Sequence, residues 1–314
     1  MTGFTVDPWD PGYAAALAVE NLSEMGATSA ELVIDIERPA ADWKPVTPGP
    51  DVSPPGTLLV ADGVRRIDAR VWVHDPDAPM PVPGIAASYA AGIVRCGPDG
   101  ADLAEIQVNR SLISASPHAP EVKTTHATYE PSKAADASFE ELSLALQRLV
   151  TQLEVDLAVR HRSRGDDLLL VDGPLRGRSH LPRTIGYIKT HHTAYLPPPQ
   201  SAVVAALAPG QRTPVFLMGT SWRRHAWYLR LPVQSSAPWA GVARCEASAD
   251  LDPAQVVRLA DEVTVALPPL AGVDYKDPRA PQNLVPIGGL EKLLRHHLGD
   301  SRLLYRALRT AAAG

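Results

Sequence analysis

An apolar run that ends in an acid constrains this chain more than any other stretch. Leu168–Val171 is such a run, with Asp167 before it and Asp172-Gly173-Pro174 after it. A short apolar run between turn residues is typical of a buried strand, and its last acid then lies at the carboxyl end of an open sheet, where functional groups are presented. Leu58–Ala61, followed by Asp62-Gly63, has the same form. The sequence therefore predicts two buried strands that each end in Asp-Gly, with two carboxylates placed to share a divalent metal. The alternative is that each Asp-Gly makes only a turn.

Composition limits the classes of protein to consider. The chain has 314 residues, enough for one elaborated domain or two, and 45% hydrophobic with 21% charged content excludes a disordered chain. A net charge of −5 argues against a uniformly basic nucleic-acid binder but leaves room for a local basic track. Cys96 and Cys245 lie far apart and form no metal-ligand spacing or disulfide framework, which fits a reducing cytosol. With no apolar run long enough to span a bilayer and no secretion signal, we expect a cytoplasmic protein that does not bind membranes.

The order of elements predicts an α/β fold with a mixed sheet. Residues 1–56 hold a helix over Asp10 to Met25 and then a proline-rich loop, so the main domain is expected at 57–314. Arg66 to His74 alternates and is expected to pair with the first strand as a hairpin. Further strands are predicted at 88–96, 101–113, 183–189, 214–218, 226–231 and 241–247, and further helices at 199–207, 252–267, 287–298 and 301–308.

The strongest helix is predicted over Ser138 to His161. Its apolar residues recur at three and four residues, and Ser138 with Glu141 forms a capping box. Glu154 lies near the carboxyl end of this helix and precedes Asp172 by 18 residues, so helix, loop and strand bring the two acids together. The alternative for Glu154 is a solvated charge on the helix surface.

A basic cluster surrounds the second strand. Between Arg160 and Lys189, seven basic residues minus three acidic ones give +4 in a chain that is acidic overall. Such a cluster beside carboxylates suits a polyanion whose phosphate is delivered to a metal. A solvated loop with scattered arginines is the alternative. The basic residues are Arg160, Arg162, Arg164, Arg176, Arg178, Arg183 and Lys189.

Strand-end Asp residues with a helical Glu are the parts needed for metal-dependent phosphodiester hydrolysis. One metal ion activates water and another stabilises the leaving oxygen, and carboxylate ligands favour Mg²⁺ or Mn²⁺ over zinc. Motifs for other chemistries are missing from the sequence: it contains no G-x-x-x-x-G-K-[ST], G-x-S-x-G, G-x-G-x-x-G or H-E-x-x-H. The residues therefore favour a nuclease over an ATPase, a serine hydrolase, a dinucleotide enzyme or a zinc hydrolase.

At this point the chain resembles the NurA nucleases, which work with a HerA-type hexameric DNA-translocating ATPase. The resemblance rests on short motifs in the same order over about residues 57 to 300: Asp62-Gly63, Glu154, Leu169–Leu175, Gly186–Lys189 and Gln282–Pro286. It implies an RNase H-like mixed sheet flanked by helices with peripheral insertions, and a Mn²⁺-dependent (or Mg²⁺-dependent) deoxyribonuclease of exo- or endonuclease type. It also implies a homodimer that docks onto the ATPase ring, in DNA repair or in defence.

The resemblance also implies roles for single residues. Asp62, Glu154 and Asp172 match the acidic metal ligands, and Lys189 is expected to neutralise the scissile phosphate or orient water. A late metal ligand is left open between Asn283, His296 and Asp277. Arg176, Arg178 and Arg183, together with Lys189, are expected to follow the nucleic-acid backbone.

Two departures from the family pattern leave other functions open. Val64 follows Asp62-Gly63 where the family usually has Ser, and Val285-Pro286 stands at the family's Tyr-Pro step. His296 has an alternative as a surface residue favoured by the dipole at a helix carboxyl end. A catalytically degenerate dimeric adaptor on a ring ATPase is therefore the second hypothesis, and an RNA-cleaving relative is the third.

Overall fold

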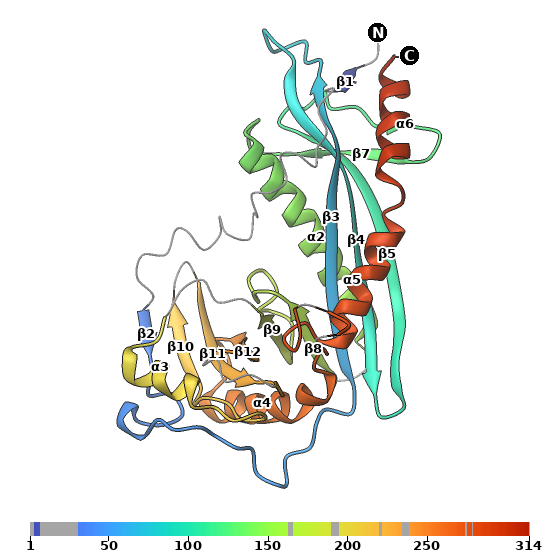
Figure 1. The fold of residues 1–314 in the computed structure, drawn as a ribbon. Helices are drawn as coiled ribbons and strands as arrows, with labels where there is room; N and C mark the ends of the chain where they lie inside the picture. The colour runs from blue at the N-terminus through green and yellow to red at the C-terminus, as the bar shows by residue number, and fades with distance from the viewer. Residues whose placement is uncertain are drawn as a thin grey trace.

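A single mixed sheet with helices on both faces organises the molecule (Figure 1). The computed structural model describes residues 3–6, 31–162, 166–189, 195–219, 222–233, 239–273, 275–277 and 279–313. The predicted helix over 10–25 lies outside these residues. Twelve strands of the described part join in the sheet. The predicted fold class is confirmed.

Five central strands place the candidate site. β3 (Leu58–Val73), β4 (Val82–Gly97) and β5 (Gly100–Ser114) form an antiparallel meander. β8 (Leu168–Asp172) pairs with β3 in parallel, and β9 (Thr184–Ile188) pairs with β8 in parallel. The resulting order of the core is β5-β4-β3-β8-β9, a mixed sheet with the parallel strands β3, β8 and β9 beside the meander.

The other strands extend this core at both edges. Beyond β9 the sheet continues antiparallel, and beyond β5 it ends in two short strands. On the β9 side these are β12 (Val242–Ser248), β11 (Arg223–Arg230), β10 (Phe216–Gly219) and β2 (Glu31–Val33); on the β5 side β7 (Thr128–Lys133) and β6 (Val122–Lys123); and β1 (Phe4–Val6) pairs with the end of β3.

The predicted hairpin within 57–74 is wrong, because β3 is one continuous strand. Its ladder with β4 runs from Leu58↔Cys96 to Val73↔Val82, and Asp62-Gly63 lies inside it. Because β4 on one side and β8 on the other both hold this part of β3 extended, the turn preference of Asp-Gly is overridden. Asp62 therefore faces the site from the middle of a strand.

Helices cover both faces of the sheet. α2 (Phe139–His161) begins as predicted at Ser138, whose Oγ accepts a hydrogen bond from the Glu141 N–H at 3.2 Å. Its apolar side packs on Leu59 and Ala61 of β3. The opposite face is covered by α4 (Pro253–Ala266) and α5 (Val285–His297), and α6 (Ser301–Ala313) continues from α5 along the far half of β3 to β5. A short helix, α3 (Pro198–Ala205), packs near β10. Among the described helices, none combines the length and apolar character needed to cross a membrane.

Candidate active site

Asp62 and Asp172 lie side by side on neighbouring parallel strands. The ladder pairs Ala61 with Val171, so the next residue on each strand is an aspartate. Side chains alternate along a strand, and Val60 and Leu170 point into the core under α4 and α5. Both carboxylates therefore project from the same face, toward α5. Asp62 is 8% exposed and Asp172 is half-buried.

The negative charge of Asp172 and burial both perturb Asp62. Burial is the main cause that raises the pKa of Asp62 from 3.8 to about 8, and the negative charge of Asp172 is the next. Lys189 and the Gly63 N–H, which donates to Asp62 Oδ1 at 2.8 Å, only partly offset this. Two acids that repel each other in a poorly hydrated position attract a cation.

Lys189 links the end of β9 to this pair. Its Nζ donates to Asp172 Oδ2 at 2.6 Å and to Asn283 Oδ1 at 3.0 Å. Asn283 is buried, and its Nδ2 donates to Asp277 Oδ2 at 2.5 Å. Lys189 thus connects Asp172 to Asn283, one of the three residues left open as the late ligand, and the Asn283 amide oxygen accepts from the lysine.

Glu154 approaches β3 from the other face. A Cβ on Gly63 would lie 2.5 Å from Glu154 Oε1, so the absence of a side chain at Gly63 admits the carboxylate of α2. Because Gly63 and Asp62 point to opposite faces of the strand, Glu154 does not lie on the Asp62 face. Arg178 Nη2 instead donates to Glu154 Oε2 in a buried ion pair. The sequence predicted that Glu154 and Asp172 come close together; the structure places Glu154 against Gly63 on the opposite face of the strand from Asp62 and pairs it with Arg178, a partner that the sequence did not predict.

The predicted backbone-tracking arginines take three different positions. Arg178 is buried against Glu154, and burial lowers its pKa to about 10, so its expected contact with a nucleic-acid backbone is wrong. Arg183, whose φ is +42°, donates to Glu262 of α4 at 2.8 Å. Arg176 is exposed in the turn after β8. Of the three, Arg176 alone is exposed, four residues after Asp172 in the chain.

Glu291 on α5 is an acid at the site that the sequence did not reveal. A Cβ on Gly92, the partner of Asp62 across the ladder, would lie 2.8 Å from Leu290 Cδ1, so α5 approaches β4 closely there. Glu291 consequently faces Asp62 and helps to raise its pKa. Its own carboxylate accepts from Arg279 at 2.8 Å and from Arg295 at 2.9 Å. Glu291 and Arg295 are four residues apart, which is the spacing of an ordinary ion pair on a helix surface. Nothing in the sequence therefore placed Glu291 at the site.

His296 does not join the acids. It lies five residues after Glu291, about 140° further round a helix of 3.6 residues per turn, and its exposed ring contacts His297. Asp75, Asp77 and His118 lie beyond the far end of β3. Among the described residues they are the one group of three His, Cys or acidic side chains whose ligand atoms lie within 4.8 Å of one another. Of the predicted trio, Asp62 and Asp172 therefore lie side by side on one face of the sheet, and Glu154 lies on the other face.

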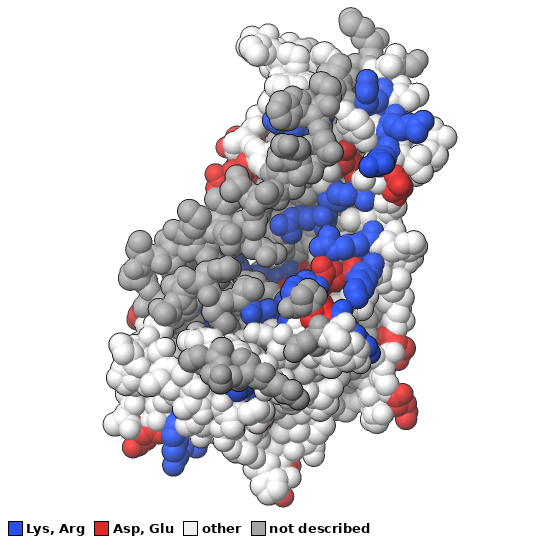
Figure 2. All heavy atoms as spheres, in the orientation of Figure 1, with Lys and Arg blue, Asp and Glu red and all other residues white. Residues whose placement is uncertain are grey.

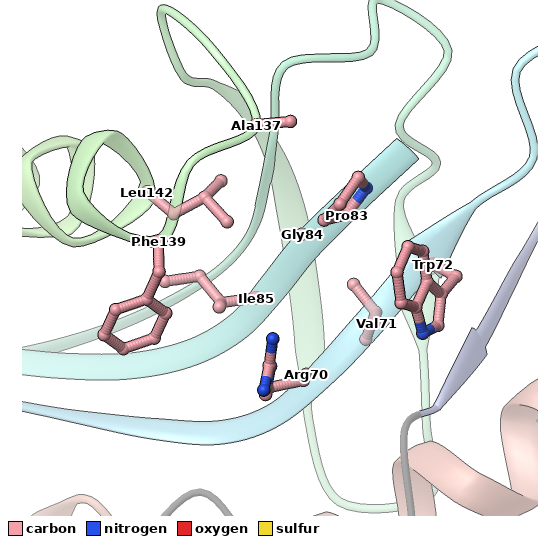
Figure 3. A pocket seen from close by; sticks show the side chains of 9 residues that line it. All are labelled: Arg70, Val71, Trp72, Pro83, Gly84, Ile85, Ala137, Phe139 and Leu142. Carbon is pink, nitrogen blue, oxygen red and sulfur yellow. The ribbon is translucent and has the colours of Figure 1, made fainter. Parts of the chain in front are cut away.

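The acid site and a cavity of the molecule lie in different places. Figure 2 shows acidic atoms in the middle of the face on which α5 lies, with basic atoms beside them and further basic atoms along α6. A cavity of about 90 Å³ lies at the other end of α2, lined by Arg70, Trp72, Phe139 and neighbouring apolar residues (Figure 3). Phe139 is the first residue of α2 and Glu154 is fifteen further on, so this cavity does not open on the acids.

Comparison with known proteins finds similarity in structure but no match in sequence. Neither a protein-family model nor a curated protein sequence matches the chain. The NurA nuclease from Sulfolobus solfataricus superposes with 12% identity and a TM-score of 0.49, covering 95% of this chain and 97% of that chain. The chain is similar to a NurA nuclease.

Two endonucleases V are also similar. The Endonuclease_V from Bacillus subtilis is 12% identical with a TM-score of 0.34, covering 82% of this chain and 87% of that one. The catalytic domain of human Endonuclease V is 16% identical with a TM-score of 0.36, covering 95% and 100%. A NurA nuclease is thus among the similar structures, as the motif order in the sequence indicated, and all three are nucleases.

Proposed function

We propose that this protein is a divalent-metal-dependent deoxyribonuclease with its centre at Asp62 and Asp172. The observation that carries the proposal is the pair itself: two carboxylates on adjacent parallel strands, on one face, with the pKa of Asp62 raised to about 8 by burial and by Asp172. Burial and repulsion by Asp172 favour a further cation at such a pair, and its hard oxygen donors suit Mg²⁺ or Mn²⁺.

The residues present fit such an ion. Asp62 and Asp172 would hold it, and Glu291 and Asn283 face the same space. When bound, the metal would supply a Lewis acid for the phosphoryl oxygens and an activated water. Lys189, which donates a hydrogen bond to Asp172, would neutralise a phosphate oxygen beside the acids, and Arg176, exposed in the turn after Asp172, would contact the nucleic-acid backbone.

The test is hydrolysis of labelled DNA by purified protein with Mn²⁺ or Mg²⁺. We expect Asp172→Asn to lower the rate about 100-fold or more while the circular dichroism spectrum is retained. Asp156→Asn is the matched control, because it removes an exposed carboxylate from α2. An unchanged rate in Asp172→Asn would refute the role. Parallel digestion of single-stranded DNA, duplex DNA and RNA separates a deoxyribonuclease from an RNA-cleaving relative.

The assembly we propose follows the resemblance to NurA: a cytoplasmic homodimer that docks onto a HerA-type ATPase. Light scattering tests the dimer, and co-purification with the ATPase tests the docking. A monomer at micromolar concentration would contradict the dimer. An ATPase ring that elutes separately from the protein would contradict the docking.

A degenerate adaptor is the second candidate, and two ion pairs favour it. Lys189 neutralises Asp172, and Arg178 neutralises Glu154. If these cations replace a metal permanently, Mn²⁺ will not raise the melting temperature. A functional metal site must raise it, because an ion that binds only the folded state stabilises that state.

A further inference from the structure

The exposed side of α6 carries a row of arginines that the catalytic proposal leaves unexplained. Arg302, Arg306 and Arg309 are spaced by four and three residues, so they lie on one face of the helix over about 10 Å. All three are exposed, and their guanidinium groups form no ion pair with any residue in the described ranges. The helix itself contains no acid; Asp300, directly before it, caps its first turn, and the nearby charge of Arg302 contributes to lowering the pKa of Asp300.

This row differs from the other arginines near the acids. Arg178, Arg183 and Arg279 are each bound to a carboxylate within the fold. An ordinary solvated helix face usually mixes the two signs of charge, whereas α6 shows one sign in a chain with a net charge of −5. Unbalanced positive charge of this kind attracts a polyanion.

The row leads to the acid site. α5 brings Glu291 against Asp62, and α6 follows after Gly299, so the two helices run in succession along β3 to β5 (Figure 1). Arg66 fixes the junction by donating to the carbonyl oxygens of Leu298 and Gly299 at 3.3 and 2.8 Å. Figure 2 shows basic atoms both beside the acidic patch and at the level of α6, with a few acidic atoms between the two groups.

We propose that Arg302, Arg306 and Arg309 bind the phosphates of a single DNA strand and lead it along α6 to Asp62 and Asp172. A single strand fits better than a duplex groove because the row is one arginine wide and straight. From Glu291 to Arg309 the 18 residues span about 27 Å at the helical rise of about 1.5 Å per residue, a length that several nucleotides of a single strand cover. This inference rests on the proposed function and names the path of its substrate.

The test is binding of fluorescent oligo(dT) of 4 and 12 nucleotides by anisotropy, in EDTA so that no cleavage occurs. The combined variant Arg302→Ala, Arg306→Ala and Arg309→Ala is compared with Lys123→Ala, Arg148→Ala and Arg258→Ala, which removes the same charge from exposed positions on β6, α2 and α4. We expect the α6 variant to bind the 12-mer about tenfold or more weakly and to reduce the slope of log K against log salt by about 2, since each phosphate contact contributes about 0.7.

The length dependence gives a second readout. The wild-type protein should prefer the 12-mer over the 4-mer, and the α6 variant should lose that preference while the control variant keeps it. Equal binding by the two combined variants, or wild-type binding to phosphatidylglycerol vesicles in place of DNA, overturns the inference.

The result separates this inference from the nuclease proposal. If the wild-type protein cleaves DNA with Mn²⁺ but the α6 variant binds like the control, the path along α6 is wrong and the nuclease stands. If the α6 variant loses binding but no metal supports cleavage, the nuclease is wrong and the path stands.

Discussion

Replacing Asp62 by Asn should stabilise the metal-free protein at neutral and alkaline pH. The folded pKa of Asp62, about 8, lies above its ordinary value of 3.8, so folding favours the protonated carboxyl. The stability associated with this group is therefore fully present below about pH 4 and is lost as the pH rises toward 8. At pH 7 the gap of about 3 pH units corresponds to on the order of 4 kcal/mol, and above pH 8 the loss reaches its limit.

Asn removes that cost because it is neutral at every pH, and its amide oxygen can still accept the Gly63 N–H. At pH 8 the gap is about 4 pH units, or on the order of 5 kcal/mol, so we expect Asp62→Asn in EDTA to raise the melting temperature by roughly 10 to 20 °C at about 2 to 4 °C per kcal/mol, and to change it little at pH 4.5. Differential scanning calorimetry across this pH range measures the effect.

Asp68→Asn is the control, and it should have the opposite sign. Asp68 is equally buried in β3, but its carboxylate accepts from Arg66 Nε at 2.8 Å, from Tyr129 Oη at 2.9 Å and from Ser88 Oγ. Its replacement should therefore cost about 1.5 to 3 kcal/mol. If Asp62→Asn lowers the melting temperature at pH 8, or shifts it equally at both pH values, the reasoning about the acid pair is refuted.

Three further outcomes follow from contacts around the site. Gly63→Ala should destabilise by about 1 to 3 kcal/mol in urea unfolding, because the new methyl group would lie 2.5 Å from Glu154 Oε1; a loss below about 0.5 kcal/mol would contradict that packing. Arg178→Met should cost about 3 to 5 kcal/mol by leaving Glu154 buried without its cation, and adding Glu154→Gln should restore most of it; no restoration would argue against the pair. His296→Ala should change Mn²⁺-dependent cleavage by no more than about twofold, whereas a large loss would make it a ligand after all.

Several elements could be predicted because local patterns decided them. Ser138 begins α2 through its own hydroxyl, and Asp252-Pro253 begins α4 with a complete capping box to Gln255. The apolar run of β8 is buried on both faces, and its last residue, Asp172, reaches the site edge as expected. These features depend on residues within a few positions of one another.

The remaining features depend on contacts between distant parts of the chain. Asp62-Gly63 resembles a turn in sequence, but pairing with β4 and β8 keeps it extended, and its glycine is required by Glu154 of α2. The pairing of Glu154 with Arg178 joins residues 24 apart, and Glu291 reaches Asp62 only because α5 packs closely over Gly92. No periodicity or motif in one sequence carries that information.

Mn²⁺ titration of the metal-free protein by calorimetry tests most directly whether Asp62 and Asp172 form a cation site. We predict that the wild-type protein binds Mn²⁺, that Asp172→Asn weakens this binding at least about tenfold, and that His118→Ala, in the separate Asp75, Asp77 and His118 group, leaves it unchanged. Binding that is the same in Asp172→Asn as in the wild type, or that is lost in His118→Ala, would contradict the site.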